Sequence, residues 1–298
     1  EVLLLRGNFE KARDYSSRAL ALYTKQENAI GQRLALTTQA RSLKAAGLFD
    51  QSIGAYLSIL NLKGAGNQEE VFLELGETYV ALNRLDKAKE VFEHILETPT
   101  RSPQDEGQAL DHLARIAVTE HNLEEAIKLY EQVLKNLDNM EPSDQDSIAA
   151  TEANLGYVYL KIGQMDQALE LIKQATTYLR KHKNWEELAI VANNCKDELI
   201  LKGNYELALR FLEEFSIPSL KKLKNPEVEN QHHYEVALLH HLQGNTSIGV
   251  RYWDKNHNRK AASSQKTARF LNSPFFDEKT RKELNRQHLA FLQQFPNS

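Results

Sequence analysis

Few side chains in this sequence have both the type and the spacing that a reaction or a metal ion requires. Two histidine pairs, His232-His233 and His240-His241, are the most conspicuous candidates. Two helical histidines share a metal ion when they stand four residues apart on one face. These pairs are separated by seven to nine residues, which is roughly 11–12 Å along a helix. One ion cannot bridge them without other ligands, so we expect no metal site and no cofactor.

The other reactive residue types also favour structural roles. The single cysteine, Cys195, lies at an apolar helical position, where a thiol acts as a small buried hydrophobe. Acidic pairs at Glu124-Glu125 and Glu186-Glu187 begin helical stretches, where a carboxylate favours the positive end of the helix dipole. The sequence contains no phosphate-binding glycine loop and no nucleophile elbow. We therefore expect no catalytic residue and a protein that is not an enzyme.

Charge and hydropathy limit the kinds of partner. The net charge is −4, which disfavours a general affinity for nucleic acid. Basic side chains gather in one stretch with few aromatic residues, which favours a solvated helix over a nucleic-acid surface: Arg251, Lys255, Arg259, Lys260, Lys266 and Arg269. No apolar run reaches the roughly 18 residues of a membrane-spanning helix. We expect a cytoplasmic protein without a membrane span.

The elements that position these side chains recur along the chain. A small residue returns about every 40 residues, preceded by a short turn signal and followed near the fourth position by an aromatic or aliphatic residue. These small residues are Ala12, Ser52, Ala88, Ala126, Ala168 and Ala208. Within each unit the apolar residues follow the i, i+3, i+4, i+7 spacing of a helix. The sequence predicts a helical hairpin that is repeated along the chain.

Two of the units carry a family pattern most clearly. One contains Phe72, Leu75, Gly76, Tyr79, Asn83, Leu85, Ala88, Phe92 and Ile95, and the other contains Leu155, Gly156, Tyr159, Gly163, Met165, Ala168, Ile172 and Ala175. These residues resemble the tetratricopeptide repeat. The resemblance implies an all-α, right-handed α-solenoid of about seven helix pairs over residues 1–255, with a truncated first repeat and a degenerate last one. Residues 256–298 are expected to form helices that cap the array.

The spacing is longer than the usual repeat of about 34 residues. We expect the additional residues in longer second helices and in loops at Thr98–Gly107 and Asp138–Ser147, with Pro99, Pro103 and Pro142 acting as helix stops. A capping helix is expected to begin at Ser273-Pro274 and to align Leu284, His288, Phe291, Leu292 and Phe295 on one face. Because the array begins within a repeat and without Met, we expect a fragment of a longer protein.

The resemblance implies that a partner binds in a concave groove lined by the first helices. Carried onto this sequence, the groove residues are Arg41, Lys44, Glu77, Asp111, His112, Arg115, Asn154, Tyr157, Lys161, Asn193, Asn194, Asp197, Tyr234 and His241. Chaperone-binding members use a clamp with Lys at a position that is Thr37, Leu73, Asp111, Ala153 or Asn193 here. The clamp is therefore not expected in this protein.

Asn154 and Asn194 share one repeat position. This is similar to repeat proteins that bind extended peptides, such as kinesin light chain and the peptide-sensing bacterial regulators. An amide can donate and accept hydrogen bonds, so it can hold a peptide backbone whatever its side chains are. Alternatively, each asparagine ties its own helix to the next repeat.

The leading hypothesis is a non-catalytic scaffold that holds a peptide or protein segment in the groove. One alternative is a peptide-responsive regulatory domain whose effector domain lies upstream. The least favoured alternative is an enzyme on a repeat scaffold. Self-association through the ends of the array is a further expectation.

Overall fold

The computed structural model describes residues 7–64, 66, 68–99, 101–140, 142, 144–245, 247–249, 251–252 and 278–293. Within these residues all regular secondary structure is helical, which confirms the all-α class. The chain divides into two compact units, Glu1–Asp144 (unit 1) and Gln145–Ser298 (unit 2). None of the described helices is long and apolar enough to cross a bilayer.

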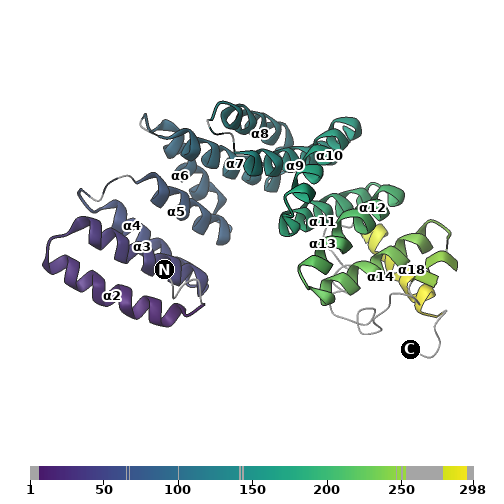
Figure 1. Ribbon diagram of the computed structural model, residues 1–298, viewed down its shortest axis with the longest axis horizontal. Helices are drawn as coiled ribbons and strands as arrows, with labels where there is room; N and C mark the ends of the chain where they lie inside the picture. Colours follow the sequence, from purple (N-terminus) through teal and green to yellow (C-terminus); the bar gives the residue numbers. More distant parts are fainter. Residues whose placement is uncertain are drawn as a thin grey trace. The chain divides into compact units, whose positions relative to one another are not determined.

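Unit 1 is a series of helices in which each packs against the next (Figure 1). Its helices are α2 (Phe9–Lys25), α3 (Ala29–Ala45), α4 (Phe49–Leu60), α5 (Glu69–Ala81), α6 (Leu85–Glu97), α7 (Pro103–Thr119) and α8 (Leu123–Asp138). The hairpins are α3 with α4, α5 with α6, and α7 with α8. The first helices α5 and α7 also contact each other, so they form one layer of the unit.

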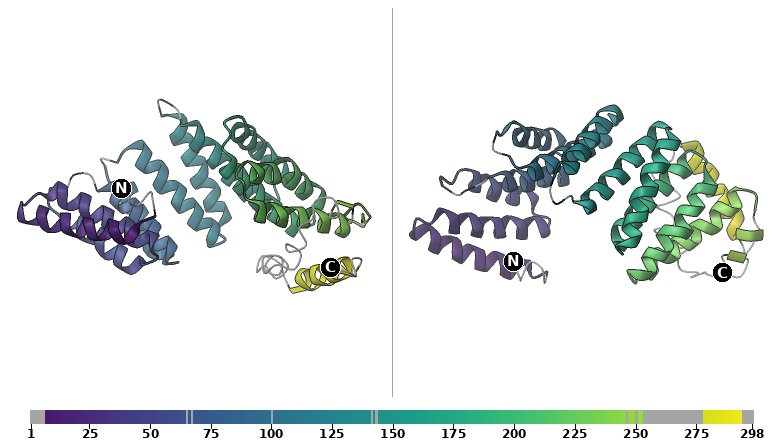
Figure 2. Two further views of the ribbon diagram at one scale, coloured as in Figure 1. Left: turned by 60° about the horizontal axis from the view of Figure 1, so that its bottom comes forward. Right: turned by 45° about the horizontal axis from the view of Figure 1, so that its top comes forward.

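Unit 2 repeats the arrangement, and Figure 2 shows its helices stacked as hairpins. Its described helices are α9 (Gln145–Ile162), α10 (Met165–Lys181), α11 (Trp185–Leu201), α12 (Tyr205–Phe211), the π-helical segment η1 (Leu212–Ser216), α13 (Ile217–Lys222), α14 (Pro226–Leu242) and α18 (Glu278–Leu292). In the hairpin that begins with α11, the second helix runs continuously through α12, η1 and α13. Helix α18 contacts α14.

A residue with a positive φ ends the first helix of each hairpin. These residues are Gly47, Asn83, His121, Gly163, Gly203 and Gly244. Five positions after each of them lies a buried small residue of the second helix: Ser52, Ala88, Ala126, Ala168, Ala208 and Gly249. The period read from the sequence is therefore the crossing point of the paired helices.

The crossings leave no room for larger side chains. A Cβ added to Gly76 of α5 would lie 2.5 Å from the ring of Phe92 on α6. A Cβ on Gly156 of α9 would lie 2.7 Å from Ile172 on α10. Phe92 and Ile172 are themselves almost fully buried, and burying one such side chain contributes about 1.5–3 kcal/mol. Close approach of the two backbones thus permits the dense apolar core between them.

The loops between hairpins differ in one respect from the expectation. Pro103 does not stop a helix, because it is the first residue of α7. Ser102 caps that helix by accepting from the Asp105 amide while Asp105 accepts from the Ser102 amide. Proline suits this first position because its missing N–H has no helical partner there. The additional residues of the repeat therefore also extend first helices.

The C-terminal expectations can be followed only in part. Helix α18 packs against α14, the last described first helix of unit 2. Ser273-Pro274 and Phe295 lie outside the described residues, as do the side chains of Leu284, His288, Phe291 and Leu292.

Candidate functional site

The first helices of the hairpins carry the side chains that could meet a partner. We call the exposed and half-buried side chains of α3, α5 and α7 in unit 1, and of α9 and α11 in unit 2, the A-helix surface of each unit. We use one repeat position as a reference and call it the marker position. It lies nine residues before the residue with a positive φ that ends each first helix. The marker positions are Thr38, Glu74 and His112 in unit 1 and Asn154, Asn194 and Glu235 in unit 2.

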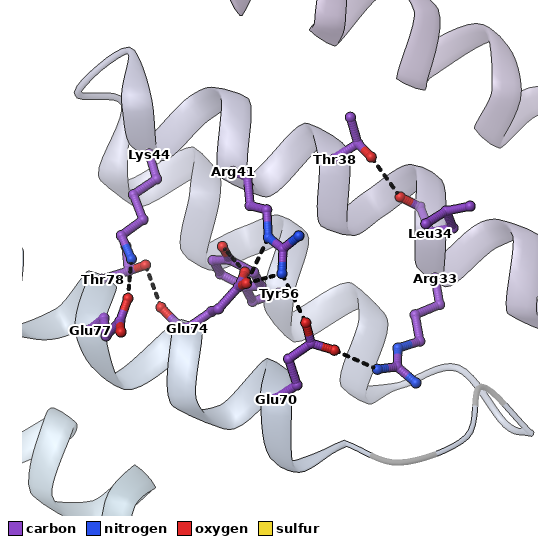
Figure 3. Close-up of polar contacts among 10 residues, drawn as sticks. All are labelled: Arg33, Leu34, Thr38, Arg41, Lys44, Tyr56, Glu70, Glu74, Glu77 and Thr78. Carbon is purple, nitrogen blue, oxygen red and sulfur yellow. Dashed lines mark hydrogen bonds and ion pairs between the residues drawn. The ribbon is translucent and has the colours of Figure 1, made fainter. Parts of the chain in front are cut away.

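In unit 1, an arginine ties α3 to α5. Arg41 donates from Nε to Glu74 at 2.6 Å and from Nη2 to Glu70 at 2.9 Å. Arg33 reaches the other oxygen of Glu70 at 3.3 Å. Figure 3 shows both arginines converging from one helix on the acidic face of the next. The hydrogen bond to Glu74 raises the pKa of Arg41, so the guanidinium is charged at every working pH.

The marker residue Glu74 has a second partner from below the surface. The hydroxyl of Tyr56, which is fully buried on α4, donates to Glu74 at 2.6 Å (Figure 3). Burial, followed by the bond to Glu74, raises the pKa of Tyr56. A carboxylate held by a guanidinium and a phenol cannot turn toward a ligand without losing both bonds.

A second chain of contacts joins α3, α5 and α7. Lys44 donates to Glu77 at 2.5 Å, and the Nε2 of His112 lies 3.4 Å from the other oxygen of Glu77. The bond with His112 lowers the pKa of Glu77 from 4.5 to about 2. The His112 ring also stacks on Phe92, with centroids 4.6 Å apart. The marker histidine is therefore a tie between repeats.

The A-helix surface of unit 2 differs at the same register. Asn194 is exposed and Asn154 is half-buried. Neither amide makes a hydrogen bond within the part of the chain that the structure describes. Beside Asn194, Ile190 is 49% exposed. The two amides and this apolar side chain offer a polar and apolar surface on neighbouring helices.

Ion pairs frame this open surface. Lys161 of α9 reaches Glu198 of α11 at 3.2 Å and lies over the Tyr157 ring, 5.1 Å from its centroid. On α11 itself, Asn193 donates to Asp197 at 3.3 Å. Tyr157 and Lys161 thus contact each other, as do Asn193 and Asp197, while the marker amides remain available.

A buried lysine lies next to this surface, and the sequence reading passed over it. Lys196 occupies the position seven residues before Gly203, which is Ala or Gly in the other described hairpins. Its ammonium is 2.8 Å from Glu235 of α14 and 2.8 Å from Asp197. Burial lowers the pKa of Lys196, but these two carboxylates outweigh it and raise the pKa. The sequence does contain a signal for it. A lysine at a position that is otherwise Ala or Gly stands out, and in the packed crossing its ammonium needs a charged partner.

Comparison with known proteins agrees with the repeat geometry. Profile models described as the tetratricopeptide repeat match residues 69–98, 109–144 and 153–183. The chain is a tetratricopeptide repeat protein. Among curated proteins, the tetratricopeptide array is 27% identical over 143 residues to kinesin light chain-related protein 1 of Arabidopsis thaliana. That match covers 44% of this chain and 23% of the relative's length, so the array corresponds to less than a quarter of that protein.

Solved structures show the same fold. The quorum sensor NprR from B. thuringiensis superposes with a TM-score of 0.61 at 16% identity, covering 85% of this chain and 71% of NprR. A tetratricopeptide repeat protein from Parabacteroides merdae superposes with a TM-score of 0.52 at 13% identity, covering 94% of this chain and 98% of that one.

Most of the residues that the sequence assigned to the groove of the tetratricopeptide array do lie on the first helices. Asp111 and Arg115 of α7 approach each other at 3.9 Å, and burial raises the pKa of Asp111. Tyr234 is different: its side chain is fully buried in α14. The expectation that it faces a partner is wrong because α14 is an interior helix, buried continuously from Gln231 to Leu239. His241 is half-buried at the end of the same helix.

Among the residues considered for chemistry, one histidine pair has structural partners. His232 is hydrogen-bonded to Ser216 at 2.7 Å, and His233 to Tyr252 at 2.9 Å. Burial raises the pKa of Cys195, which removes its nucleophilic character near neutral pH. The described residues contain no cluster suited to a metal ion. Of the basic stretch, only Arg251 falls within the described residues.

Proposed function

We propose that this chain is a non-catalytic scaffold that binds an extended peptide segment of a partner protein on the A-helix surface of unit 2. The observation that supports this most is the state of the marker amides. Asn154 and Asn194 occupy equivalent positions on α9 and α11 and keep their hydrogen-bonding groups available. A side-chain amide bonds a peptide N–H and a peptide C=O together, as a neighbouring strand does.

The surroundings of the two amides suit a peptide ligand. Ile190 offers an exposed apolar contact on α11, and Tyr157 offers the edge of a ring fixed by Lys161. A peptide backbone held by the amides would therefore have its side chains selected mainly by apolar contact with Ile190 and Tyr157.

In this proposal the A-helix surface of unit 1 has a different role. Arg41, Glu74, Glu77 and His112 already satisfy one another. A ligand there would have to replace charge-assisted hydrogen bonds within the protein, which gains little net free energy. We therefore assign the unit 1 residues to the cohesion of the array and the unit 2 amides to the ligand.

A second candidate function is a peptide-responsive regulator. The observation that favours it is the likeness in fold to the quorum sensor NprR over most of this chain. Under this alternative, a bound peptide changes the packing of the hairpins, whereas a scaffold keeps the same packing in both states. Small-angle X-ray scattering of the free chain and of the chain saturated with its peptide distinguishes the two.

The test is affinity capture from the source cells with three forms of the chain. The wild type is compared with Asn154→Ala/Asn194→Ala and with the control Gln167→Ala, which removes an exposed amide from the second helix α10. A partner retained by the wild type and the control but lost with the double variant supports the proposal. Equal recovery by all three forms contradicts it.

A further inference from the structure

A second surface of unit 2 lies on the side of its second helices. A groove of about 300 Å³ runs between α10 and the α12–η1 segment. Its floor is apolar and is formed by Ile172 and Phe211, which are buried, and by Leu169, Leu207 and Phe215, which are half-buried. The volume suits one or two large side chains of a partner.

The π-helical segment shapes one wall of this groove. The Ile217 amide bonds to the carbonyl of Leu212, five residues back, as a π turn requires. Pro218 follows, and it has no N–H to offer to the carbonyl of Glu214 four residues before it. Arg180 of α10 donates to that carbonyl at 2.8 Å. An irregular turn of this kind often marks a functional site.

Arg180 is fixed across the groove by two contacts. Besides the bond to Glu214, its guanidinium lies over the ring of Phe215, 4.7 Å from the centroid. Neither Arg180 nor Lys173 forms an ion pair with a carboxylate among the described residues, and both are exposed at the rim. Arg210 is paired with the single rim carboxylate, Glu214, at 3.3 Å. The rim therefore carries three cations and one anion beside an apolar floor.

The positive rim is particular to this hairpin. Lys173 lies five residues after the small residue Ala168, and the corresponding residues in unit 1 are Leu57, Glu93 and Glu131. The charge at this position is thus reversed between α10 and the second helices α6 and α8. A surface that served only to keep the array in solution would need no such reversal.

We propose that the groove between α10 and α12–η1 is a second docking site, which takes a short acidic protein segment carrying an aromatic or long aliphatic side chain. The apolar side chain enters between Leu169 and Phe215. Acidic residues next to it pair with Lys173 and Arg180. The site is separate from the A-helix surface, so one unit can bind two segments at once.

The experiment is a selection of random peptides displayed on phage, carried out on the full chain. Four forms are used in parallel: the wild type, Lys173→Glu, Lys173→Glu/Arg180→Glu, and Asn154→Ala/Asn194→Ala. Circular dichroism melting shows that each form is folded. Lys173 is exposed and tied to no carboxylate, so Lys173→Glu tests the charge even where Arg180→Glu disturbs the contact with Glu214.

We expect peptides that combine an aromatic residue with Asp or Glu to be enriched on the wild type and on the asparagine variant. Their affinity should fall about tenfold or more with the charge-reversed forms, and it should fall with rising salt. Selected peptides without acidic residues, or peptides that bind all four forms equally, would overturn the proposal. So would self-association of the chain that Lys173→Glu abolishes, because the occupant would then be a second copy.

Discussion

At the marker position, unit 1 has Thr38, Glu74 and His112. Glu74 and His112 are occupied by contacts from neighbouring helices, and Thr38 bonds to the carbonyl of Leu34 in its own helix. Unit 2 has Asn154 and Asn194, whose amides are available, and Glu235, which is paired with Lys196. The backbone register is the same in both units, so the fold leaves this position free to serve either cohesion or recognition. A marker residue serves cohesion where its side chain can be charged and the adjacent first helix supplies the opposite charge. A neutral amide at the same position is left for recognition.

The two units also differ in how deeply their ion pairs are buried. Arg41 with Glu70 and Lys44 with Glu77 are partly exposed to water, whereas Lys196 with Glu235 is almost fully buried. Exposed pairs contribute little because solvent screens them. Loss of one partner from a buried pair leaves an isolated charge in a medium of low polarity. Unit 2 should therefore depend on one interaction far more than unit 1 does.

The largest effect is expected from Glu235→Ala. It removes the buried carboxylate that lies 2.8 Å from the ammonium of Lys196, and we expect unit 2 to lose about 3–5 kcal/mol of its free energy of unfolding. Urea unfolding followed by tryptophan fluorescence measures this, since Trp185 and Trp253 both belong to unit 2. The double variant Lys196→Met/Glu235→Leu should recover most of the loss. A loss below about 1 kcal/mol for Glu235→Ala would contradict the account.

The second-largest effect is expected from acid, which should unfold unit 2 at a higher pH than unit 1. The pKa of His232 is lowered from 6.5 to about 3, mainly by burial and also by the nearby Lys196 and His233, while Asp197 opposes the shift. His232 therefore binds a proton less readily in the folded state than in the unfolded state. Its contribution to the free energy of unfolding is present above pH 6.5 and lost as the pH falls toward 3. For Glu77, the contribution is present above pH 4.5 and lost as the pH falls toward 2.

We therefore expect the fluorescence of unit 2 to report unfolding at a higher pH than the circular dichroism of the whole chain. His232→Gln should remove the higher of the two transitions, and Glu77→Gln should alter only the lower one. Coincident transitions that neither substitution moves would show that other groups control acid unfolding.

Larger side chains at the helix crossings test a feature that both units share. Ala88 and Ala168 are fully buried crossings in unit 1 and unit 2. Replacing either by Leu should lower the free energy of unfolding of its unit by about 1–3 kcal/mol. Thermal melting of Ala88→Leu and Ala168→Leu, with Ala21→Leu at an exposed position of α2 as the control, checks this. Near-wild-type melting of both variants would mean that the crossings are looser than described.

A smaller loss is expected from Tyr56→Phe. The change removes the bond to Glu74 and leaves the ring in place, so about 0.5–1.5 kcal/mol should be lost from unit 1. Tyr15→Phe on α2 is the control, since Tyr15 is 59% exposed. Equal melting temperatures for the two variants would show that Glu74 does not depend on Tyr56.

The fold could be predicted from the sequence because it depends on local chemistry. In each hairpin, a residue with a positive φ ends the first helix, and a small residue five positions later lets the second helix cross it closely. The ion pairs between neighbouring first helices could not be predicted in this way, because they join residues 29 to 39 positions apart, such as Arg41 with Glu70 or Lys196 with Glu235. Their formation depends on how far one helix is displaced along the next. Tyr234 was placed wrongly for a related reason, since register alone does not reveal that α14 is covered on all sides.

We propose above all that the marker residues Asn154 and Asn194 of unit 2 serve recognition, whereas the marker residues Glu74 and His112 of unit 1 serve cohesion. The most direct measurement is the affinity of the captured partner peptide and the melting temperature, both determined for Asn154→Ala/Asn194→Ala and for wild type. We expect a loss of affinity of about tenfold or more with a melting temperature close to that of wild type. Unchanged affinity with a large drop in melting temperature would show that these asparagines tie the repeats together.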